Sequence, residues 1–393
     1  MASVDSRASE NAPARGGRLQ ADTLALSVAV LLVVTVVQRS VGFGRGILFC
    51  RWLSPEDLGQ WEMAYSFLLL AAPLAVLGVP GSFGRYTEHF RQRGHLRTFL
   101  ERAGGWTLCC SALGVVVLWL AAPSISTLLF GSNDHVTLVR GISLTLCAVI
   151  FHHTLTALLV SLRMYRVVSA MSLLFAAAAL AMLTIRPGVG AIVFGYGISC
   201  FTATLAAFLW AWPGLRDLER PDKALPHGDF WPKLLRFAFF VWVTNLLSHL
   251  FAIVDRYMIV HYSGMSPAAA LQQIGNYHSS RIVPLLFVSF ADLLSGLVMP
   301  HLSDDWEAGR RRKVDLRVNT LVKLTGLGMT AAGCCVLLAA PLLFTVILQG
   351  RYDSGLAVLP WTLAGCVSYG RFCLSQNYLS EAGKPRPATL PVV

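Results

Sequence analysis

Long apolar stretches alternate with short polar segments along almost the whole chain. Ten of these stretches approach or exceed the roughly 20 residues that a helix needs to cross a bilayer. They span residues 23–50, 59–83, 104–125, 136–162, 168–185, 188–212, 237–262, 275–299, 321–348 and 355–379. Backbone hydrogen bonds must be satisfied internally in lipid, so runs of this length predict helices. The pattern therefore predicts an all-α polytopic membrane protein with about ten transmembrane helices.

Basic residues predict the orientation of these helices. Of the 32 lysines and arginines, 23 lie in or next to the polar segments on one side of the ten stretches, four lie in or next to those on the other side, and five lie deeper within the stretches. The positive-inside rule places the basic side, and with it both termini, in the cytoplasm.

The longest cytoplasmic segment, residues 213–236, contains four prolines and divides the chain into two lobes. We expect a six-helix N-lobe at 23–212 and a four-helix, incomplete C-lobe at 237–380. Residues 1–22 are predicted to form a polar cytoplasmic tail. Residues 381–393 are expected to form either a second tail or the start of a further span.

A short internal similarity relates the two lobes. The first and seventh stretches each carry an arginine in their outer half, followed by an external Ser-Pro and a Gly-polar-aromatic sequence. The two sets are Arg45, Ser54-Pro55 and Gly59-Gln60-Trp61, and Arg256, Ser266-Pro267 and Gly275-Asn276-Tyr277. This similarity predicts parallel repeats, an arrangement in which transporters place a site between halves. A chance match of short motifs is the alternative.

Composition agrees with a membrane protein. Only 13% of the residues are charged, against roughly 25% in soluble domains. The net charge of +11 would suggest nucleic-acid binding in a soluble protein, but here the cations follow membrane orientation, so no nucleic-acid partner is expected. The nine cysteines show no metal-ligand spacing, and we interpret them as small apolar residues in packed helices.

Four arginines inside the stretches are candidate substrate ligands, because an arginine at mid-membrane costs about 2.5–3.5 kcal/mol and usually faces a cavity or a partner. They are Arg39, Arg45, Arg256 and Arg281, from both lobes. Together they predict a cationic vestibule for a phosphate or pyrophosphate, whose oxygens match guanidinium geometry. The alternative for Arg45 and Arg256 is that they extend to the outer headgroups.

Two carboxylates lie well inside the seventh and eighth stretches. Asp255 and Asp292 either balance an arginine or carry a coupling proton or sodium ion. Adjacent helical residues point about 100° apart, so we predict that Asp255 and Arg256 do not pair directly. The sequence contains no P-loop, no His-Glu-x-x-His motif and no large extramembrane domain. We therefore expect a carrier without catalytic residues, metal or cofactor.

Three motifs resemble the polysaccharide-biosynthesis (O-antigen type) flippases of the multidrug/oligosaccharidyl-lipid/polysaccharide exporter superfamily. They are Leu53-Ser54-Pro55-Glu56-Asp57-Leu58-Gly59, Leu77-Gly78-Val79-Pro80-Gly81-Ser82 with Arg85-Tyr86, and Val254-Asp255-Arg256-Tyr257-Met258-Ile259. The resemblance implies a multi-pass protein of the bacterial cytoplasmic (inner) membrane that flips a polyprenyl-(pyro)phosphate-linked oligosaccharide. Arg39, Arg45 and Arg256 would then be cavity cations, and membrane lipids and other polysaccharide-assembly proteins would be its partners. The family usually has twelve to fourteen spans, so a four-helix C-lobe departs from its pattern.

Two alternatives remain open at this stage. One is a cation-coupled exporter of small amphipathic compounds, which should carry acidic rather than basic cavity residues. The other is a non-transporting membrane component of a polysaccharide pathway, either an enzyme or a scaffold, which would need a catalytic loop or a large external domain.

Overall fold

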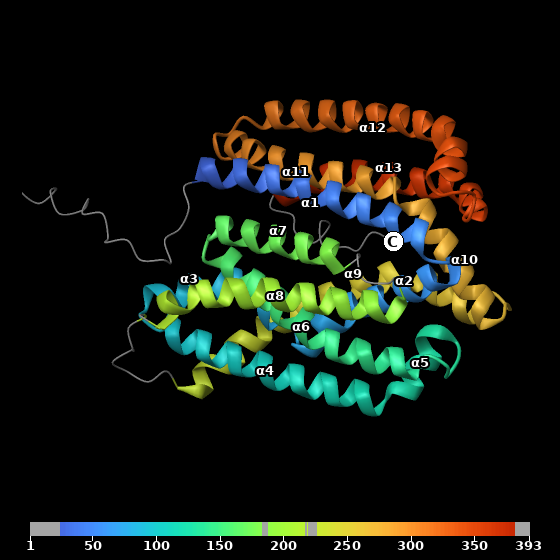
Figure 1. The fold of residues 1–393 in the computed structure, drawn as a ribbon. Coiled ribbons are helices and arrows are strands. Elements are labelled where there is room, and N and C mark those ends of the chain that lie inside the picture. Colours follow the sequence, from blue (N-terminus) through green and yellow to red (C-terminus); the bar gives the residue numbers. More distant parts are fainter. Residues whose placement is uncertain (1–23, 183–187, 217, 219–225, 382–393) are drawn as a thin grey trace, which may run out of the picture.

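The computed structural model describes residues 24–182, 188–216, 218 and 226–381, and its regular structure there is helical throughout (Figure 1). This confirms the all-α prediction. The predicted tails, 1–22 and 381–393, lie outside the described residues except for Glu381, the last residue of α13. The elements are α1 (Leu24–Trp52), α2 (Pro55–Ala75), the 3₁₀ turn η1 (Val79–Ser82), α3 (Phe83–Gln92), α4 (Leu96–Leu120), α5 (Ala122–Phe130), α6 (Val136–Ser161), α7 (Tyr165–Met182), α8 (Val189–Arg216), α9 (His227–Tyr262), α10 (Pro267–Arg281), α11 (Pro284–Glu307), α12 (Arg311–Leu342), the π turn η2 (Leu343–Ile347) and α13 (Asp353–Glu381).

Within the described residues, each predicted stretch overlaps one helix or consecutive helices. Among the described residues, six helices are long and apolar enough to cross a membrane, and eight spans result if each bent pair counts as one. The apolar part of α7 is shorter, and α13 is not among the candidates. The structure thus supports six to eight spans by length and composition, and the count of ten stays a prediction.

Two predicted spans are broken in the middle. The chain bends by 65° between α2 and the segment formed by η1 and α3, where Leu77 (φ 50°) and Gly78 (φ 70°) adopt left-handed backbone conformations. It bends by 49° between α10 and α11, where Pro284 has no N–H to continue the helical ladder. Both breaks redirect a helix that begins at a Ser-Pro sequence.

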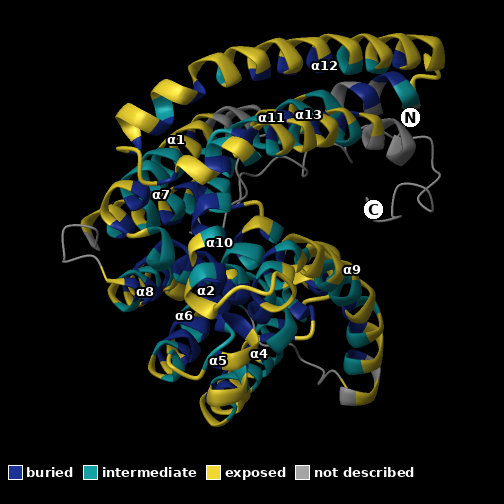
Figure 2. Cartoon of the chain, turned by 90° about the vertical axis from the view of Figure 1, so that its right-hand side faces the viewer, coloured by how far each residue is buried: buried dark blue, intermediate teal, exposed yellow. Residues whose placement is uncertain are grey.

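The two sequence halves, α1–α8 and α9–α13, exchange helices in space: α1 lies beside α11, whereas α9 packs on α2 and η1 (Figures 1 and 2). In the N-terminal half α6 packs between α4 and α8, and in the C-terminal half α13 packs against α11 and α12. The halves meet mainly where α2 packs on α10 and α9. Helix α8 runs to Arg216 and α9 begins at His227, so helix occupies part of the predicted linker.

Large apolar side chains cover much of the outer surface. Leu120, Leu338 and Trp361 are 77%, 84% and 78% exposed, and the outer face of α12 is exposed along its length (Figure 2). Soluble monomers rarely expose contiguous apolar patches of this kind. Contact with lipid removes this surface from water, as expected for transmembrane helices.

A buried carboxylate joins α11 to α12 beyond the apolar part of α11. The side chain of Asp305 is only 2% exposed, and it accepts from Nε of Arg310 at 2.7 Å. It also pairs with Nζ of Lys313 at 3.2 Å and with Arg317. Hydrogen bonds from Arg310 and Lys313, together with the charge of Arg317, hold the pKa of Asp305 below its ordinary value.

We expect Asp305→Asn to lower the melting temperature at pH 7. A carboxylate with a depressed native pKa stabilises the fold above its ordinary value of 3.8, and this contribution is lost as pH falls through the lower native value. The difference between variant and wild type should therefore shrink at acid pH. Thermal melts from pH 3 to pH 7 test this, with the exposed Asp315→Asn as control; equal effects of both variants would contradict it.

Candidate functional site

The two halves approach most closely where α2 crosses α10. Both helices begin with serine caps followed by proline, and the Oγ atoms of Ser54 and Ser266 accept from the amides of Asp57 and Ala269. A Cβ added to Gly59 would lie 1.9 Å from the carbonyl oxygen of Leu271. A Cβ added to Gly275 would lie 1.9 Å from the carbonyl oxygen of Pro55. Only glycine permits this close approach of α2 to α10. The approach also brings together the following turn of each helix, which carries Glu62 in α2 and His278 in α10.

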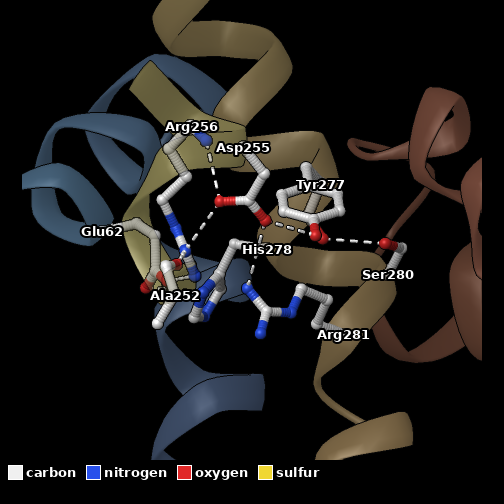
Figure 3. Close-up of polar contacts among 8 residues, drawn as sticks. All are labelled: Glu62, Ala252, Asp255, Arg256, Tyr277, His278, Ser280 and Arg281. Carbon is white, nitrogen blue, oxygen red and sulfur yellow. Dashed lines mark hydrogen bonds and ion pairs between the residues drawn. The ribbon is translucent and has the colours of Figure 1, made fainter. Parts of the chain in front are cut away.

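An ion-pair network lies beside this contact and joins three helices from both halves (Figure 3). Glu62 of α2 accepts from Nη2 of Arg256 on α9 through Oε1, and its Oε2 lies 2.8 Å from Nδ1 of His278 on α10. Glu62 and Arg256 are each only 5% exposed. Arg256 also donates to the carbonyl of Ala252, one turn earlier in α9. A buried charge is tolerated when it is paired and hydrogen-bonded in this way.

Asp255 forms the second centre of the network (Figure 3). Its Oδ2 accepts from the hydroxyl of Tyr277 at 2.6 Å, and its Oδ1 lies 3.2 Å from Nη1 of Arg256. Nη1 of Arg281 lies 3.9 Å from Oδ2 of the same carboxylate. The guanidinium groups of Arg256 and Arg281 lie 5.9 Å and 5.2 Å from the centre of the Tyr277 ring. One carboxylate, one phenol and two guanidinium groups thus meet between α9 and α10.

The prediction that Asp255 and Arg256 do not pair was wrong. Their Cβ atoms diverge on the helix, but the long arginine stem returns its guanidinium to the neighbouring carboxylate. The same carboxylate also accepts from the backbone N–H of Arg256 at 2.8 Å.

The structure brings together only some of the predicted ligands. Arg256 and Arg281 converge on Asp255, whereas Arg45 and Arg39 lie on α1. Arg45 is half-buried, with its guanidinium 5.9 Å from the centre of the Phe49 ring, and Arg39 is exposed. Within the described residues, no contact of Arg39 or Arg45 with Arg256 or Arg281 is recorded.

Asp292 lies apart from the network, at the contact between α11 and α13. It accepts from the hydroxyl of Tyr369 at 3.2 Å and lies 3.8 Å from Sγ of Cys373. It is half-buried, and its recorded hydrogen bonds come from neutral groups. The part of the chain that the structure describes contains no group of three or more potential metal ligands.

Glu62 and His278 were not predicted as site residues. Both directly follow the Gly-polar-aromatic sequences of the internal similarity, as Gly59-Gln60-Trp61-Glu62 and Gly275-Asn276-Tyr277-His278. Equivalent positions of two repeats are natural partners across a pseudo-twofold axis, and these two side chains do meet at 2.8 Å. Extending the similarity by one residue would have identified the pair.

Comparisons with known proteins agree with this architecture. The family model described as polysaccharide biosynthesis protein matches residues 24–292. No curated protein sequence matches the chain.

Solved structures of the MOP superfamily share the fold. A structure of the lipid II flippase MurJ in an inward closed conformation is 15% identical, with a TM-score of 0.73 over 92% of this chain and 77% of that one. An inward-facing multidrug resistance MATE family transporter is 12% identical. Its TM-score is 0.70, and the alignment covers 91% of this chain and 86% of the transporter. A MOP superfamily transporter from Pyrococcus furiosus, described by the reverse polarity of its binding pocket, is 14% identical, with a TM-score of 0.62 over 95% and 85%.

The fold is thus that of MATE and MurJ structures, and the molecule is a multi-pass membrane protein. Because the family model covers more than half of the sequence, the chain belongs to the polysaccharide biosynthesis protein family.

Proposed function

We propose that the chain is a flippase that moves a polyprenyl-(pyro)phosphate-linked oligosaccharide across the bacterial cytoplasmic membrane for envelope polysaccharide synthesis. Its family supports a role in polysaccharide synthesis, and the likeness to MurJ supports a lipid-linked cargo. The observation that carries the proposal is the buried ion-pair network of Glu62, Asp255, Arg256, Tyr277, His278 and Arg281 between the two halves.

The contacts of Glu62 in this network suit alternating access because they can form only while the halves are closed on each other. Glu62 belongs to the N-terminal half, whereas Arg256 and His278 belong to the C-terminal half. Separating α2 from α9 would leave Arg256 with Asp255 but without the carboxylate of Glu62. An anionic substrate group can then replace that carboxylate through charge-assisted hydrogen bonds. The substrate would thereby bind the open arrangement more tightly and shift the population toward it.

In this scheme Arg281 is the cation that binds the phosphate first, because its guanidinium has the weakest existing contacts. Its Nη1 makes no hydrogen bond within the described structure and has only a 3.9 Å ion pair with Asp255. Arg39 and Arg45 of α1 remain proposed ligands for a later position of the same cargo. Asp255 balances Arg256 and Arg281, so Asp292, with neutral partners, is the better candidate for ion coupling.

We infer that the contacts of Glu62 across the two halves close one side of the protein in this arrangement. The positive-inside rule places the Ser-Pro starts of α2 and α10 at the outer surface, so the closed side would be the outer one.

We expect Arg281→Ala to slow translocation by about tenfold or more, since a hydrogen bond to a charged group contributes roughly 1.5–3 kcal/mol. Translocation of a fluorescent polyprenyl-pyrophosphate oligosaccharide in proteoliposomes is the measurement. Arg140→Ala serves as control, because Arg140 is exposed on α6 against Trp119. An inactive wild type would refute the flippase, whereas active wild type and fully active Arg281→Ala would refute only the site.

The second candidate is a cation-coupled exporter of small amphipathic compounds, which the MATE structures favour. It predicts uptake of an amphipathic cationic dye into inverted vesicles, driven by a sodium or proton gradient and abolished by Asp292→Asn. Gradient-driven dye transport without flipping of the oligosaccharide would favour the exporter. Neither activity would favour a non-transporting component of the pathway.

A further inference from the structure

A large apolar groove lies on the N-terminal half, over α6 and between α4 and α8. Its volume is about 1030 Å³, at the upper end of the roughly 300–1,000 Å³ of pockets that bind small molecules. Large apolar side chains line it, including Phe194, Phe201, Phe208 and Trp212 of α8. All four of these are 40–57% exposed. No residue of the ion-pair network lines the groove, so it is a separate feature.

The charged residues that line the groove lie at one end only. Its lining comes from the first half of α4 and from the later parts of α6 and α8, and these segments lead to the same end of the bundle. At that end the lining includes Arg97, Glu101 and Arg216. Nε of Arg97 bonds Oε1 of Glu101 at 2.9 Å, and its Nη1 donates to the carbonyl of Leu218 at 3.3 Å. These bonds hold the guanidinium at the mouth of the groove.

We propose that this groove binds an anionic phospholipid of the inner leaflet. The phosphate would lie at Arg97 and Arg216, and the acyl chains would cover the apolar wall toward the middle of the membrane. Positive-inside orientation places the charged end at the cytoplasmic surface, where basic pockets between transmembrane helices bind acidic headgroups. Two guanidinium groups and one carboxylate leave one net positive charge, which selects an anionic over a zwitterionic headgroup.

Two adjacent glycines provide a matched steric test. Gly104 lines the groove, and Gly105 does not. Both are exposed on α4, and a Cβ added at either would meet nothing within 4 Å. The start of a side chain therefore meets no neighbour at either position, and of the two only position 104 lies in the groove lining.

Native mass spectrometry of the full chain, with added phosphatidylglycerol or phosphatidylcholine of identical acyl chains, tests the proposal. We expect the wild type to retain phosphatidylglycerol at least about fivefold better than phosphatidylcholine. One net positive charge contributes roughly 1 kcal/mol, which corresponds to about that ratio. The double variant Arg97→Gln/Arg216→Gln should lose this preference. Gly104→Phe should release both lipids. If Gly104→Phe does not fold, Gly104→Leu places a smaller side chain at the same position. Gly105→Phe should match wild type.

Three results would overturn the proposal. The first is equal retention of the two lipids by wild type. The second is an equal loss of preference in Arg312→Gln/Lys323→Gln, which removes two exposed cations from α12. The third is displacement of phosphatidylglycerol by an equimolar polyprenyl phosphate, which would assign the groove to the tail of the proposed cargo.

Discussion

Replacing Glu62 with alanine is expected to destabilise the protein by at most about 3–5 kcal/mol, because Arg256 would lose its buried carboxylate partner and keep only Asp255, whose side chain is 36% exposed. Glu62 and Arg256 are both nearly inaccessible, and Nε of Arg256 already has no hydrogen-bond partner in the described structure. His278 would lose its contact with Oε2 of Glu62 at the same time. Thermal unfolding in one detergent, compared with wild type, measures the effect.

Removing both charges tests whether the instability of Glu62→Ala comes from the arginine that has lost its partner. Glu62→Leu combined with Arg256→Met should recover most of the lost stability, because apolar residues of similar volume often replace buried ion pairs without cost. Glu56→Ala is the control on the same helix, since Glu56 has no recorded ion pair and contributes at most about 1 kcal/mol through the helix dipole. A Glu62→Ala melt no lower than that of Glu56→Ala would show that the buried pair is absent in solution.

The fold was predictable because lipid forces each apolar stretch to be a helix, and within the described residues every predicted stretch overlaps one helix or consecutive helices. The bends were not predicted. They depend on left-handed backbone at Leu77 and Gly78, and on a proline, Pro284, that ends one helix and begins the next. Hydrophobic periodicity averages over many residues and does not register such local breaks.

The site was predictable only where a charge lies deep in an apolar stretch. Arg256, Arg281 and Asp255 were identified in this way, and all three belong to the ion-pair network. Glu62 and His278 were missed because they follow glycine and aromatic residues near the starts of predicted spans, where polar residues are common. The only sequence signal for the pair is the internal similarity extended by one residue, because the contact itself depends on how α2 crosses α10.

A second large effect is expected at the crossing itself. Gly59→Ala and Gly275→Ala each place a Cβ 1.9 Å from a backbone carbonyl oxygen, of Leu271 and Pro55 respectively. A backbone oxygen cannot rotate away as a side chain can, so α2 and α10 must move apart. We expect each variant to lose about 1–3 kcal/mol, as in overpacked cores, and the double variant to lose more.

Separation of the two helices should also weaken the contact of Glu62 with His278, which lies one turn further along both helices. Hydrogen exchange should therefore rise in residues 55–64 and 267–279, while α6 and α8 keep their protection. Gly84→Ala is the matched control, because a Cβ there meets nothing within 4 Å and alanine favours a helix over glycine by up to about 1 kcal/mol. Wild-type melting and exchange in both crossing variants would mean that the halves are already apart in solution, and the proposed closed arrangement would fail. Loss of protection confined to α2 and α10 would instead identify this crossing as the contact that must open during transport.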